Sequence, residues 1–258
     1  MDNQKAVIVA ISGCSSSGKT TLARLLRDIF PSTMILHEDD FYKPEAELPT
    51  RHGFLDWDCA EAISVPDMRA ALEHIRATGT FPTNVVSKED QNSVGKCPVS
   101  EAKIDAMKAK VAEWIQPGKP GYVVFNARKL QLCLFDGFLV YSQEMKGVME
   151  LLDIKLFLLV SREKATRRRE ARDGYVTLEG FWKDPPGYVD KIVWPNYAKE
   201  HAWLFEDGDV EGVLDKDVLK KAGISAQLGR ELDIDMETTL EWAVDLLMSE
   251  LERMTAAT

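Results

Sequence analysis

The chain has 258 residues, 45% of them hydrophobic, which is enough to bury one substantial core and to carry a small lid or insertion. We therefore expect a single domain over residues 1–258. The 42 acidic and 32 basic side chains give a formal net charge of −10. Such a charge opposes broad attraction to nucleic acid or to an anionic membrane, so we expect neither as a partner.

The cysteines and the N-terminal segment both favour a reducing, intracellular compartment. Four cysteines stand at positions 14, 59, 97 and 133, without the paired spacing of a zinc site. The apolar run at residues 7–11 is too short for a signal sequence, and no stretch approaches the length of a membrane span. We expect a soluble cytoplasmic protein, with the nucleus as an open alternative. The oligomeric state stays open.

Short apolar runs alternate with helical patterns along the chain. The patterns predict strands at residues 6–11, 34–36, 130–135 and 154–160, and helices at residues 21–29, 65–77, 101–115, 162–172, within 189–205 and at 240–254. Strands that alternate with helices and are themselves mostly apolar predict an α/β fold, in which a largely parallel sheet is covered by helices on both faces.

Two segments do not fit this alternation. Residues 80–129 are rich in Pro, Gly, Ser and Lys around one amphipathic stretch, and we interpret them as an insertion. Residues 162–190 join a basic helix to a loop of glycine, proline and aromatic residues, which we interpret as a small helical and loop lid. The region after Leu214 carries no motif that predicts a role.

A complete phosphate-binding motif stands between the first predicted strand and the first predicted helix. The segment Gly13-Cys14-Ser15-Ser16-Ser17-Gly18-Lys19-Thr20 matches G-x-x-x-x-G-K-[ST] in full, and Thr21 follows it. The glycines let the backbone curl around a phosphate, and the next helix directs its positive dipole end there. We therefore expect a P-loop NTPase-type fold in which Lys19 contacts the β and γ phosphates of ATP and Thr20 binds Mg²⁺. A chance Gly/Ser-rich turn is the weaker interpretation.

Carboxylates follow two of the other predicted strands. Asp136 ends the run at residues 130–135, where an acidic residue supports Mg²⁺ in phosphate-loop enzymes, although Asp-Gly is also a common turn pair. Asp39 and Asp40 follow the strand at 34–36, and adjacent strands bring them near the γ phosphate. A carboxylate there could orient and deprotonate an acceptor hydroxyl. In an extended backbone only one of the two aspartates faces the site, and a solvated acidic turn is the alternative.

A basic stretch lies on the predicted helix at residues 162–172. Arg168, Arg169 and Arg172 could offer guanidinium groups to the oxygens of a transferring phosphate. A solvated basic face and a nucleic-acid patch are the alternatives, and the acidic chain as a whole disfavours the second.

The segment at residues 53–58 mixes aromatic and acidic side chains. Trp57 suits the stacking of a flat ring, and Asp58 suits hydrogen bonds to sugar hydroxyls. Taken alone, such a segment is more often a loop with a buried tryptophan.

With these residues in view, the chain resembles the nicotinamide riboside kinases, a branch of the uridine-kinase-like P-loop enzymes. The matching pieces follow the family's order over roughly the first two hundred residues, at positions 11–13, 17–23, 39–45, 53–55, 58, 137–139, 167–169, 186–188 and 193–195. A match of this length is far more specific than a phosphate loop alone.

The resemblance implies transfer of the γ-phosphoryl group of ATP to the ribose 5′-hydroxyl of nicotinamide riboside, giving the mononucleotide that feeds NAD synthesis. By motif, Asp40 is implied as the general base and as a neighbour of Mg²⁺. Thr20 and Asp136 are implied to complete the metal site, and Lys19 is the second catalytic residue.

The resemblance also implies how the nucleoside is held. Trp57 would lie against the base, and Tyr175 is the candidate lid aromatic over the nicotinamide ring. Arg168 and Arg172 would face ATP. The remaining substrate contacts implied by the resemblance are Asp40, Phe41, Tyr42, Lys43, Asp58 and Arg169.

Three departures from the family pattern bear on these roles. Members commonly have Glu at the position of Asp136, so the shorter side chain would reach the metal through water. They often have Tyr at the position of Trp57, so stacking is kept and a phenolic hydrogen bond is lost. The chain is also longer between Thr80 and Leu130 and after Tyr175, which leaves the lid register open.

Two other functions remain as alternatives. A uridine, cytidine or other small-metabolite kinase of the same superfamily would share the phosphate loop and Asp40, and only residues 53–58 favour nicotinamide riboside. A nucleotide-hydrolysing regulatory switch would need segments ordered by the γ phosphate. The sequence carries no N-K-x-D motif for guanine, and the carboxylates after the second strand fit an acceptor hydroxyl better.

Overall fold

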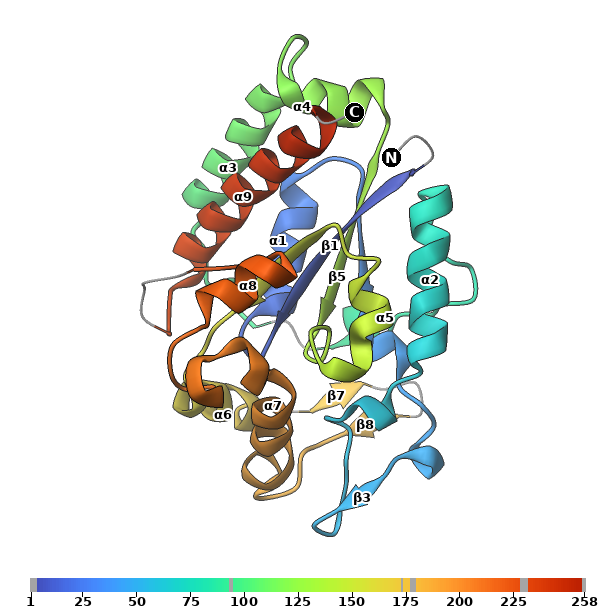
Figure 1. The fold of residues 1–258 in the computed structure, drawn as a ribbon, viewed down its shortest axis with the longest axis vertical. Helices are drawn as coiled ribbons and strands as arrows, with labels where there is room; N and C mark the ends of the chain where they lie inside the picture. The colour runs from blue at the N-terminus through green and yellow to red at the C-terminus, as the bar shows by residue number, and fades with distance from the viewer. Residues whose placement is uncertain (1–3, 93–94, 173, 177–179, 228–231, 257–258) are drawn as a thin grey trace.

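The computed structural model describes residues 4–92, 95–172, 174–176, 180–227 and 232–256. Its centre is a sheet of five parallel strands in the order β2-β5-β1-β6-β9 (Figure 1). The strands are β1 (Ala6–Gly13), β2 (Thr33–His37), β5 (Gln131–Gly137), β6 (Ile154–Leu158) and β9 (Ile224–Ala226). The prediction of a largely parallel α/β sheet is confirmed.

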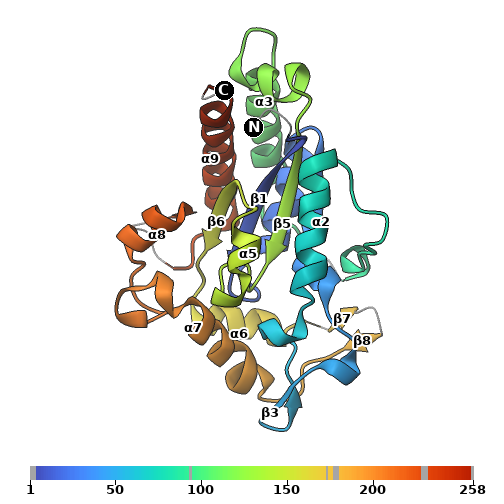
Figure 2. The same cartoon turned by 45° about the vertical axis from the view of Figure 1, so that its right-hand side comes forward.

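Helices cover both faces of this sheet, because β1 is apolar on both sides. Ala6, Ile8 and Ala10 of β1 pack into one hydrophobic cluster, and the residues between them pack into another. The first cluster is covered by α2 (Val65–Thr78), α5 (Lys146–Met149), α7 (Trp194–His201) and α8 (Lys216–Ala222). The second is covered by α1 (Lys19–Ile29), α3 (Glu101–Trp114) and α9 (Met236–Ala256), and Figure 2 shows the two layers on either side of the strands.

The helix α3, which lies within residues 80–129, is part of this cover. Met107, Val111 and Trp114 belong to the same cluster as Leu247 of α9, and the indole Nε1 of Trp114 donates to Glu252 at 2.6 Å. The chain then passes through the short helix α4 (Pro120–Tyr122) and the π-turn η5 (Val123–Ala127) to β5. The interpretation of residues 80–129 as an insertion stays a prediction.

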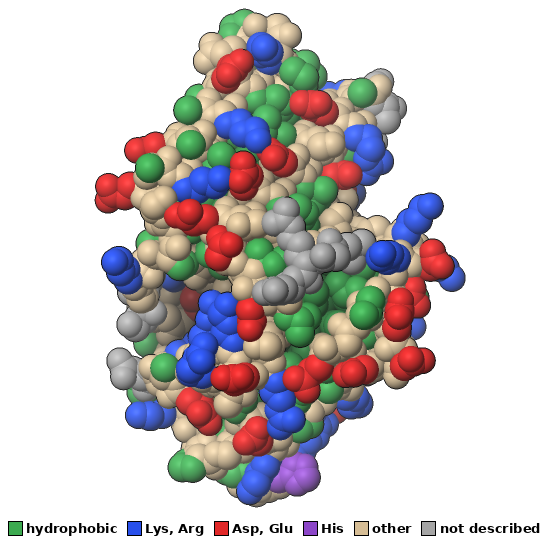
Figure 3. Space-filling view, turned by 90° about the vertical axis from the view of Figure 1, so that its left-hand side faces the viewer, with side chains coloured by type: hydrophobic (Ala, Val, Ile, Leu, Met, Phe, Trp, Pro, Cys, Tyr) green, Lys and Arg blue, Asp and Glu red, His purple; other side chains and the backbone are tan. Residues whose placement is uncertain are grey.

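The surface over α3 and α9 carries charges of both signs. Lys103 and Lys110 of α3 pair with Glu241 and Asp245 of α9. Figure 3 shows acidic and basic side chains interspersed on this side of the molecule. In the described part of the chain, no helix has both the length and the apolar character needed to cross a membrane.

Some elements differ from their predicted limits. The strand expected at residues 154–160 ends at Leu158, and the basic helix is α6 (Arg162–Glu170). The helical region expected within residues 189–205 consists of a π-turn η7 (Val189–Val193), α7 and a 3-10 turn. The strand β9 and the helix α8 were not predicted.

The carboxyl ends of β1, β2 and β5 meet at one edge of the sheet, where parallel α/β folds place their ligands. Asp136, near the end of β5, is in register with Ile11 of β1 and His37 of β2. Two short antiparallel strand pairs, β3–β4 (Thr50–Arg51 with Phe54–Leu55) and β7–β8 (Tyr175–Val176 with Phe181–Trp182), lie beyond this edge (Figure 1). This edge is therefore the place to look for a site.

Candidate active site

The phosphate loop curls tightly between β1 and α1. Gly13 has a φ of 146°, and a Cβ atom there would lie 2.4 Å from the carbonyl oxygen of Leu158, so only glycine fits. Lys19 is buried, and its Nζ donates to the carbonyl oxygen of Cys14 at 3.0 Å. The hydroxyls of Ser16 and Ser17 are buried without a hydrogen-bond partner. Backbone and side chains here thus leave polar groups available to a bound phosphate.

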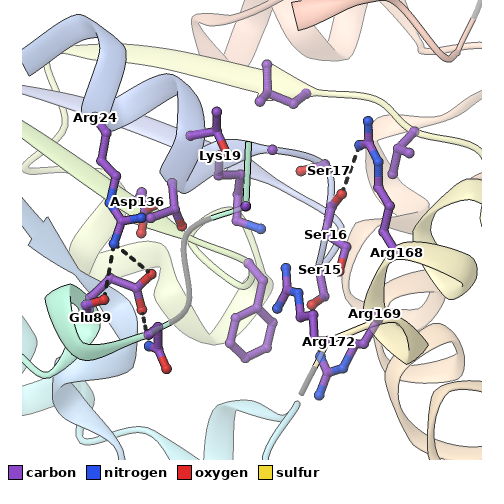
Figure 4. Close-up of a pocket in the computed structure, with 18 of the residues that line it drawn as sticks. Ser15, Ser16, Ser17, Lys19, Arg24, Glu89, Asp136, Arg168, Arg169 and Arg172 are labelled. Carbon is purple, nitrogen blue, oxygen red and sulfur yellow. Dashed lines mark hydrogen bonds and ion pairs between the residues drawn. The ribbon is translucent and has the colours of Figure 1, made fainter. Parts of the chain in front are cut away.

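A cavity of about 860 Å³ opens beside this loop. Most of the predicted site residues line it: Ser15, Ser16, Ser17, Gly18, Lys19, Thr20, Thr21, Asp40, Tyr42, Trp57, Asp58, Asp136, Arg168, Arg169, Arg172 and Tyr175. Figure 4 shows Lys19 between two groups of side chains, with Arg24, Glu89 and Asp136 on one side and the loop serines with the three arginines on the other.

Two predicted substrate contacts lie away from this lining. Phe41 is buried in the hydrophobic cluster beneath α2. The Nζ of Lys43 donates to the carbonyl oxygen of Glu61 at 2.8 Å on the exposed side of the chain. Neither side chain therefore borders the space that a nucleoside could occupy.

Asp136 and Thr20 form the part of the site that suits a magnesium ion. Oδ1 of Asp136 lies 3.0 Å from Nδ1 of His37, while Oδ2 is buried without a hydrogen-bond partner. Burial opposes the charge of Asp136, but the hydrogen bond and charge of His37, together with Thr20 and Lys19, outweigh it and lower the pKa of this carboxyl. The Thr20 hydroxyl lies beside the same carboxylate.

His37 in turn carries a positive charge at neutral pH. Burial works against that charge, but the hydrogen bond and the charge of Asp136 raise the pKa of His37 to about 9. Within the described residues, no three acidic, histidine or cysteine side chains converge tightly enough to hold a metal. A magnesium ion at Thr20 and Asp136 would therefore depend on the phosphates of the nucleotide for its remaining ligands.

The two aspartates after β2 lie in a 3-10 turn, η1 (Glu38–Phe41), so the extended backbone considered from the sequence does not apply. Oδ2 of Asp40 accepts a hydrogen bond from the backbone N–H of His37 at 3.3 Å, and its carboxylate also interacts with the side chain of Ser87. The Asp40 carboxylate is thus held by its own turn and by a neighbouring loop.

Asp39 also lines the cavity. Its charge acts on Lys19 of the phosphate loop, on Tyr42 and on Arg172, which lies just after the end of α6. Burial raises the pKa of the Asp39 carboxyl to about 7, and the nearby carboxylates of Glu89 and Asp136 act in the same direction. Asp39 therefore has the surroundings of a group that exchanges a proton near neutral pH.

Arg169 and Asp58 form a buried ion pair on the other side of the cavity. Nη1 and Nη2 of Arg169 lie 2.7 and 2.9 Å from the two carboxylate oxygens of Asp58. Nη1 also donates to Oγ of Ser15 at 2.9 Å, and Nε donates to Asp184 at 2.6 Å. One guanidinium group thus joins the phosphate loop to the acidic residue of the aromatic segment.

The aromatic side chains around Trp57 form a second wall. Tyr42 meets Trp57 edge-on with ring centroids 5.2 Å apart, and the backbone N–H of Trp57 donates to the hydroxyl of Tyr188 at 3.0 Å. Trp182 of β8 lies 5.6 Å from Trp57 at an angle of 49°. Tyr175 instead lies under the guanidinium of Arg172, 4.7 Å from it.

Two more arginines lie beside the cavity, Arg168 in α6 and Arg172 just after the end of that helix. Nη1 of Arg168 donates to the carbonyl oxygen of Ser16 at 3.1 Å (Figure 4). Nη1 of Arg172 is buried without a hydrogen-bond partner. Burial, helped by the charge of Arg169, lowers the pKa of Arg172 to about 10. A bound anion would relieve this unfavourable environment.

Comparison with curated proteins finds relatives of this chain that share most of its length. The chain is 36% identical to the nicotinamide riboside kinase of Schizosaccharomyces pombe over 250 residues, which covers 96% of this chain and 99% of the relative. The chain belongs to the nicotinamide riboside kinase family. It is also 35% identical over 218 residues to the nicotinamide riboside kinase of Saccharomyces cerevisiae, covering 83% of this chain and 85% of the relative. The resemblance predicted from the motifs is confirmed.

Other comparisons are more distant. Nicotinamide riboside kinase 1 of Homo sapiens is 28% identical over 196 residues, covering 76% of each chain. No family model matches the chain. A solved structure described as a possible uridine kinase from Bacillus stearothermophilus aligns with a TM-score of 0.41 at 13% identity, covering 76% of this chain and 81% of that chain, which is too distant to add to the argument.

Several residues that line the cavity were not predicted from the sequence as site residues. Glu89 accepts hydrogen bonds from Arg24 of α1 and from Asn92, at 3.1 and 2.7 Å, and Asn92 accepts one from the backbone of Val176 in β7 at 2.7 Å. These contacts join the phosphate-loop helix to the β7–β8 strand pair. Their sequence carries no motif, so no local signal could have found them.

The start of α9 also borders the cavity, beyond the phosphate loop. Gln227, Asp233 and Thr239 line it. The methyl group of Met236 would lie 2.5 Å from a Cβ atom placed on Gly18. The region after Leu214 carries no motif, but in the folded chain it packs beside the phosphate loop.

Proposed function

We propose that this chain transfers the γ-phosphoryl group of ATP to the ribose 5′-hydroxyl of nicotinamide riboside, giving nicotinamide mononucleotide for NAD salvage. The observation that supports this most is the single cavity that joins a complete phosphate loop to the Asp58–Arg169 pair and Trp57. The names of the yeast and human relatives support the same reaction.

On the nucleotide side, we propose that Lys19 and the loop serines bind the phosphates of ATP, with Arg168 and Arg172 beside them. Thr20 and Asp136 would hold Mg²⁺, which supplies charge neutralisation at the β and γ phosphates when bound. The unpartnered Oδ2 of Asp136 and the unpartnered Nη1 of Arg172 support these roles.

For the proton transfer, we propose Asp39 in place of Asp40. The oxygen of the 5′-hydroxyl forms a bond to the γ phosphorus, the bond from that phosphorus to the β–γ bridging oxygen breaks, and the hydroxyl proton passes to the carboxylate. Asp39 supports this role because it acts on Lys19 and on the nucleoside-side Tyr42. Asp40 is held by His37 and Ser87, so we propose that it positions the turn and the metal environment.

On the nucleoside side, we propose that Asp58 and Arg169 bind the ribose hydroxyls and that Trp57 lies against the base. A buried carboxylate that already has two charged hydrogen bonds suits a pair of vicinal hydroxyls. Asp58 and Arg169 would both keep hydrogen-bond partners when the sugar binds. Residues 162–190 would act as the lid. The four free cysteines support a reducing, cytoplasmic setting.

The test is to incubate the purified protein with ATP, Mg²⁺ and nicotinamide riboside and to measure ADP and nicotinamide mononucleotide together. Equal amounts of the two products, absent without Mg²⁺, are expected. ADP without the mononucleotide would favour a nucleotide-hydrolysing switch or another acceptor. If neither ADP nor the mononucleotide formed, the proposal would be overturned.

A further inference from the structure

Residues 86–92 form a short segment that borders the cavity and to which the sequence assigns no role. Val86, Lys88, Glu89 and Asn92 line the cavity. The centre of the segment is a single 3-10 turn, η4 (Glu89–Gln91). One turn has too few backbone hydrogen bonds to be stable alone, so the position of this segment depends on its side-chain contacts.

The first of these contacts ties the segment to the helix of the phosphate loop. Nη2 of Arg24 donates to the carbonyl oxygen of Glu89 at 3.1 Å and lies 3.6 Å from Oε1 of the Glu89 carboxylate. Arg24 follows Thr20 by one turn of α1, so the two side chains share a face of that helix. Figure 4 shows Arg24 extending from α1 toward Glu89. The segment is therefore anchored one helical turn beyond the phosphate loop.

The second contact ties the segment to the proposed lid, through both ends of the Asn92 amide. Its Nδ2 donates to Oε2 of Glu89 at 2.7 Å, and its Oδ1 accepts a hydrogen bond from the backbone N–H of Val176 in β7, also at 2.7 Å. An ionised carboxylate only accepts and a backbone N–H only donates, so these two partners fix the orientation of the amide. Asn92 therefore links α1, through Glu89, to a strand that lies 84 positions further along the chain.

The strand β7 carries Tyr175 next to Val176, and Tyr175 supports an arginine. Cζ of Arg172 lies 4.7 Å from the centroid of the Tyr175 ring, which is the arrangement of a cation–π contact. Nη1 of the same guanidinium is buried without a hydrogen-bond partner among the described residues. Arg172 is thus placed by the ring beneath it, while at least one of its donors is available to a phosphate.

We propose that Asn92 is a positioning residue that sets the guanidinium of Arg172 relative to the phosphate loop. Its hydrogen bond with Val176 fixes the backbone beside Tyr175, and the ring of Tyr175 in turn holds Arg172. This inference rests on the proposed function, in which Arg172 binds the phosphates of ATP. An arginine side chain loses conformational freedom when it binds an anion, and support that orders the side chain beforehand lowers this cost and favours binding.

The experiment is a double-mutant cycle on the affinity for ATP, measured by calorimetry with the full chain and Mg²⁺ and without a nucleoside. Asn92→Ala should raise the Kd for ATP about threefold to tenfold, the cost of ordering one long side chain on binding. In an Arg172→Gln background the same substitution should change the Kd by less than about twofold, because the group that Asn92 positions is gone. Val176→Pro removes the same hydrogen bond from the donor side and keeps an extended strand at Tyr175, so it should give the same result if Asn92→Ala does not fold.

Asn84→Ala is the matched control, because Asn84 is exposed, lies a few positions earlier in the same region and is outside the cavity lining. It should leave the Kd for ATP unchanged. Equal weakening by Asn92→Ala in both backgrounds would indicate a structural role and overturn the inference, as would an unchanged Kd in the wild-type background.

The same measurements separate this inference from the proposed function. Coupling between Asn92 and Arg172 in a protein that binds ATP but yields no nicotinamide mononucleotide would support the inference and overturn the proposed reaction. ATP binding without coupling would overturn the inference alone. If the wild-type protein bound no ATP, both would be overturned.

Discussion

Arg169 binds both carboxylate oxygens of Asp58, with N–O distances of 2.7 and 2.9 Å, and neither side chain is more than 8% exposed. A buried carboxylate that is already paired is held in one orientation before any substrate arrives. The same guanidinium is bound to Ser15 of the phosphate loop. One residue therefore joins the Asp58 side of the cavity to the phosphate loop.

Asp58→Asn should raise the KM for nicotinamide riboside and lower kcat/KM by roughly tenfold to a hundredfold, because a charged hydrogen bond is worth about 1.5–3 kcal/mol. Asp184 remains to pair with Arg169, so the fold should be kept. The measurement is steady-state kinetics at saturating ATP. Asp190→Asn, which alters an exposed pair with Arg162, is the control and should behave as wild type. An unchanged KM for Asp58→Asn would contradict the ribose role.

Asp39→Asn should lower kcat by about a hundredfold to ten-thousandfold, the usual loss when a general base is removed. Asp40→Asn should have a smaller effect, because that carboxylate is already held by His37 and Ser87. Single-turnover rates of both variants, with ATP binding measured in parallel, make the comparison. The reverse ranking would return the base to Asp40.

The activity of the wild-type enzyme should fall on acidification, over a pH range set by the pKa of Asp39. Burial raises the pKa of this carboxyl to about 7, and only the ionised form accepts a proton, so kcat/KM should increase with pH up to neutrality. The measurement is a pH profile at saturating Mg²⁺-ATP. An ordinary aspartate would leave the profile flat down to about pH 5, and such a profile would argue against Asp39.

Glu38→Gln should make the protein less sensitive to alkaline pH. Burial raises the pKa of Glu38 to about 8 from an ordinary 4.5, so its stabilising contribution is complete below about pH 4.5 and is lost as the pH rises to about 8. Glutamine keeps an acceptor for the backbone N–H of Leu139, which Glu38 binds at 3.0 Å.

We therefore expect the variant to exceed wild type in unfolding free energy at pH 8 by on the order of 2 kcal/mol, and by much less at pH 5. Urea unfolding at the two pH values measures this. A difference that is the same at both values would show that charge at Glu38 is not the cause.

Lys19→Met should abolish most phosphoryl transfer, since the buried ammonium belongs to the phosphate loop and donates to the carbonyl oxygen of Cys14 within it. Lys43→Met is a matched substitution outside the cavity lining, and it should leave kcat and the KM for the riboside close to wild type. Steady-state measurements of kcat and KM, made in parallel on the two variants, test both expectations. A large loss from Lys43→Met would restore the substrate contact expected from the family motif.

The phosphate loop could be predicted because all its residues are contiguous and the motif fixes their conformation. The sequence placed Asp39 and Asp40 after a strand, but it did not predict the 3-10 turn that sets their orientation, and the role of each stays a prediction. The strand β9 has only three residues, so its apolar pattern is too short to separate from a loop.

Trp182 and Glu89 are examples of residues whose tertiary contacts could not be predicted from the sequence. Trp182 meets Trp57 across more than a hundred positions of chain, and Glu89 reaches Arg24 from a segment without a motif. Each contact is set by tertiary packing of loops, whose sequence pattern carries little information about distant partners. The assignment of Tyr175 as the lid aromatic stays a prediction.

The most direct test of the account is the value of kcat/KM for nicotinamide riboside, uridine, cytidine and adenosine with purified protein and Mg²⁺-ATP. The account predicts a clear preference for nicotinamide riboside, because one cavity joins the phosphate loop to the Asp58–Arg169 pair and to Trp57, which are proposed to hold the ribose and the base. A preference for uridine or cytidine would keep the phosphoryl-transfer chemistry and contradict the assignment of the nucleoside site.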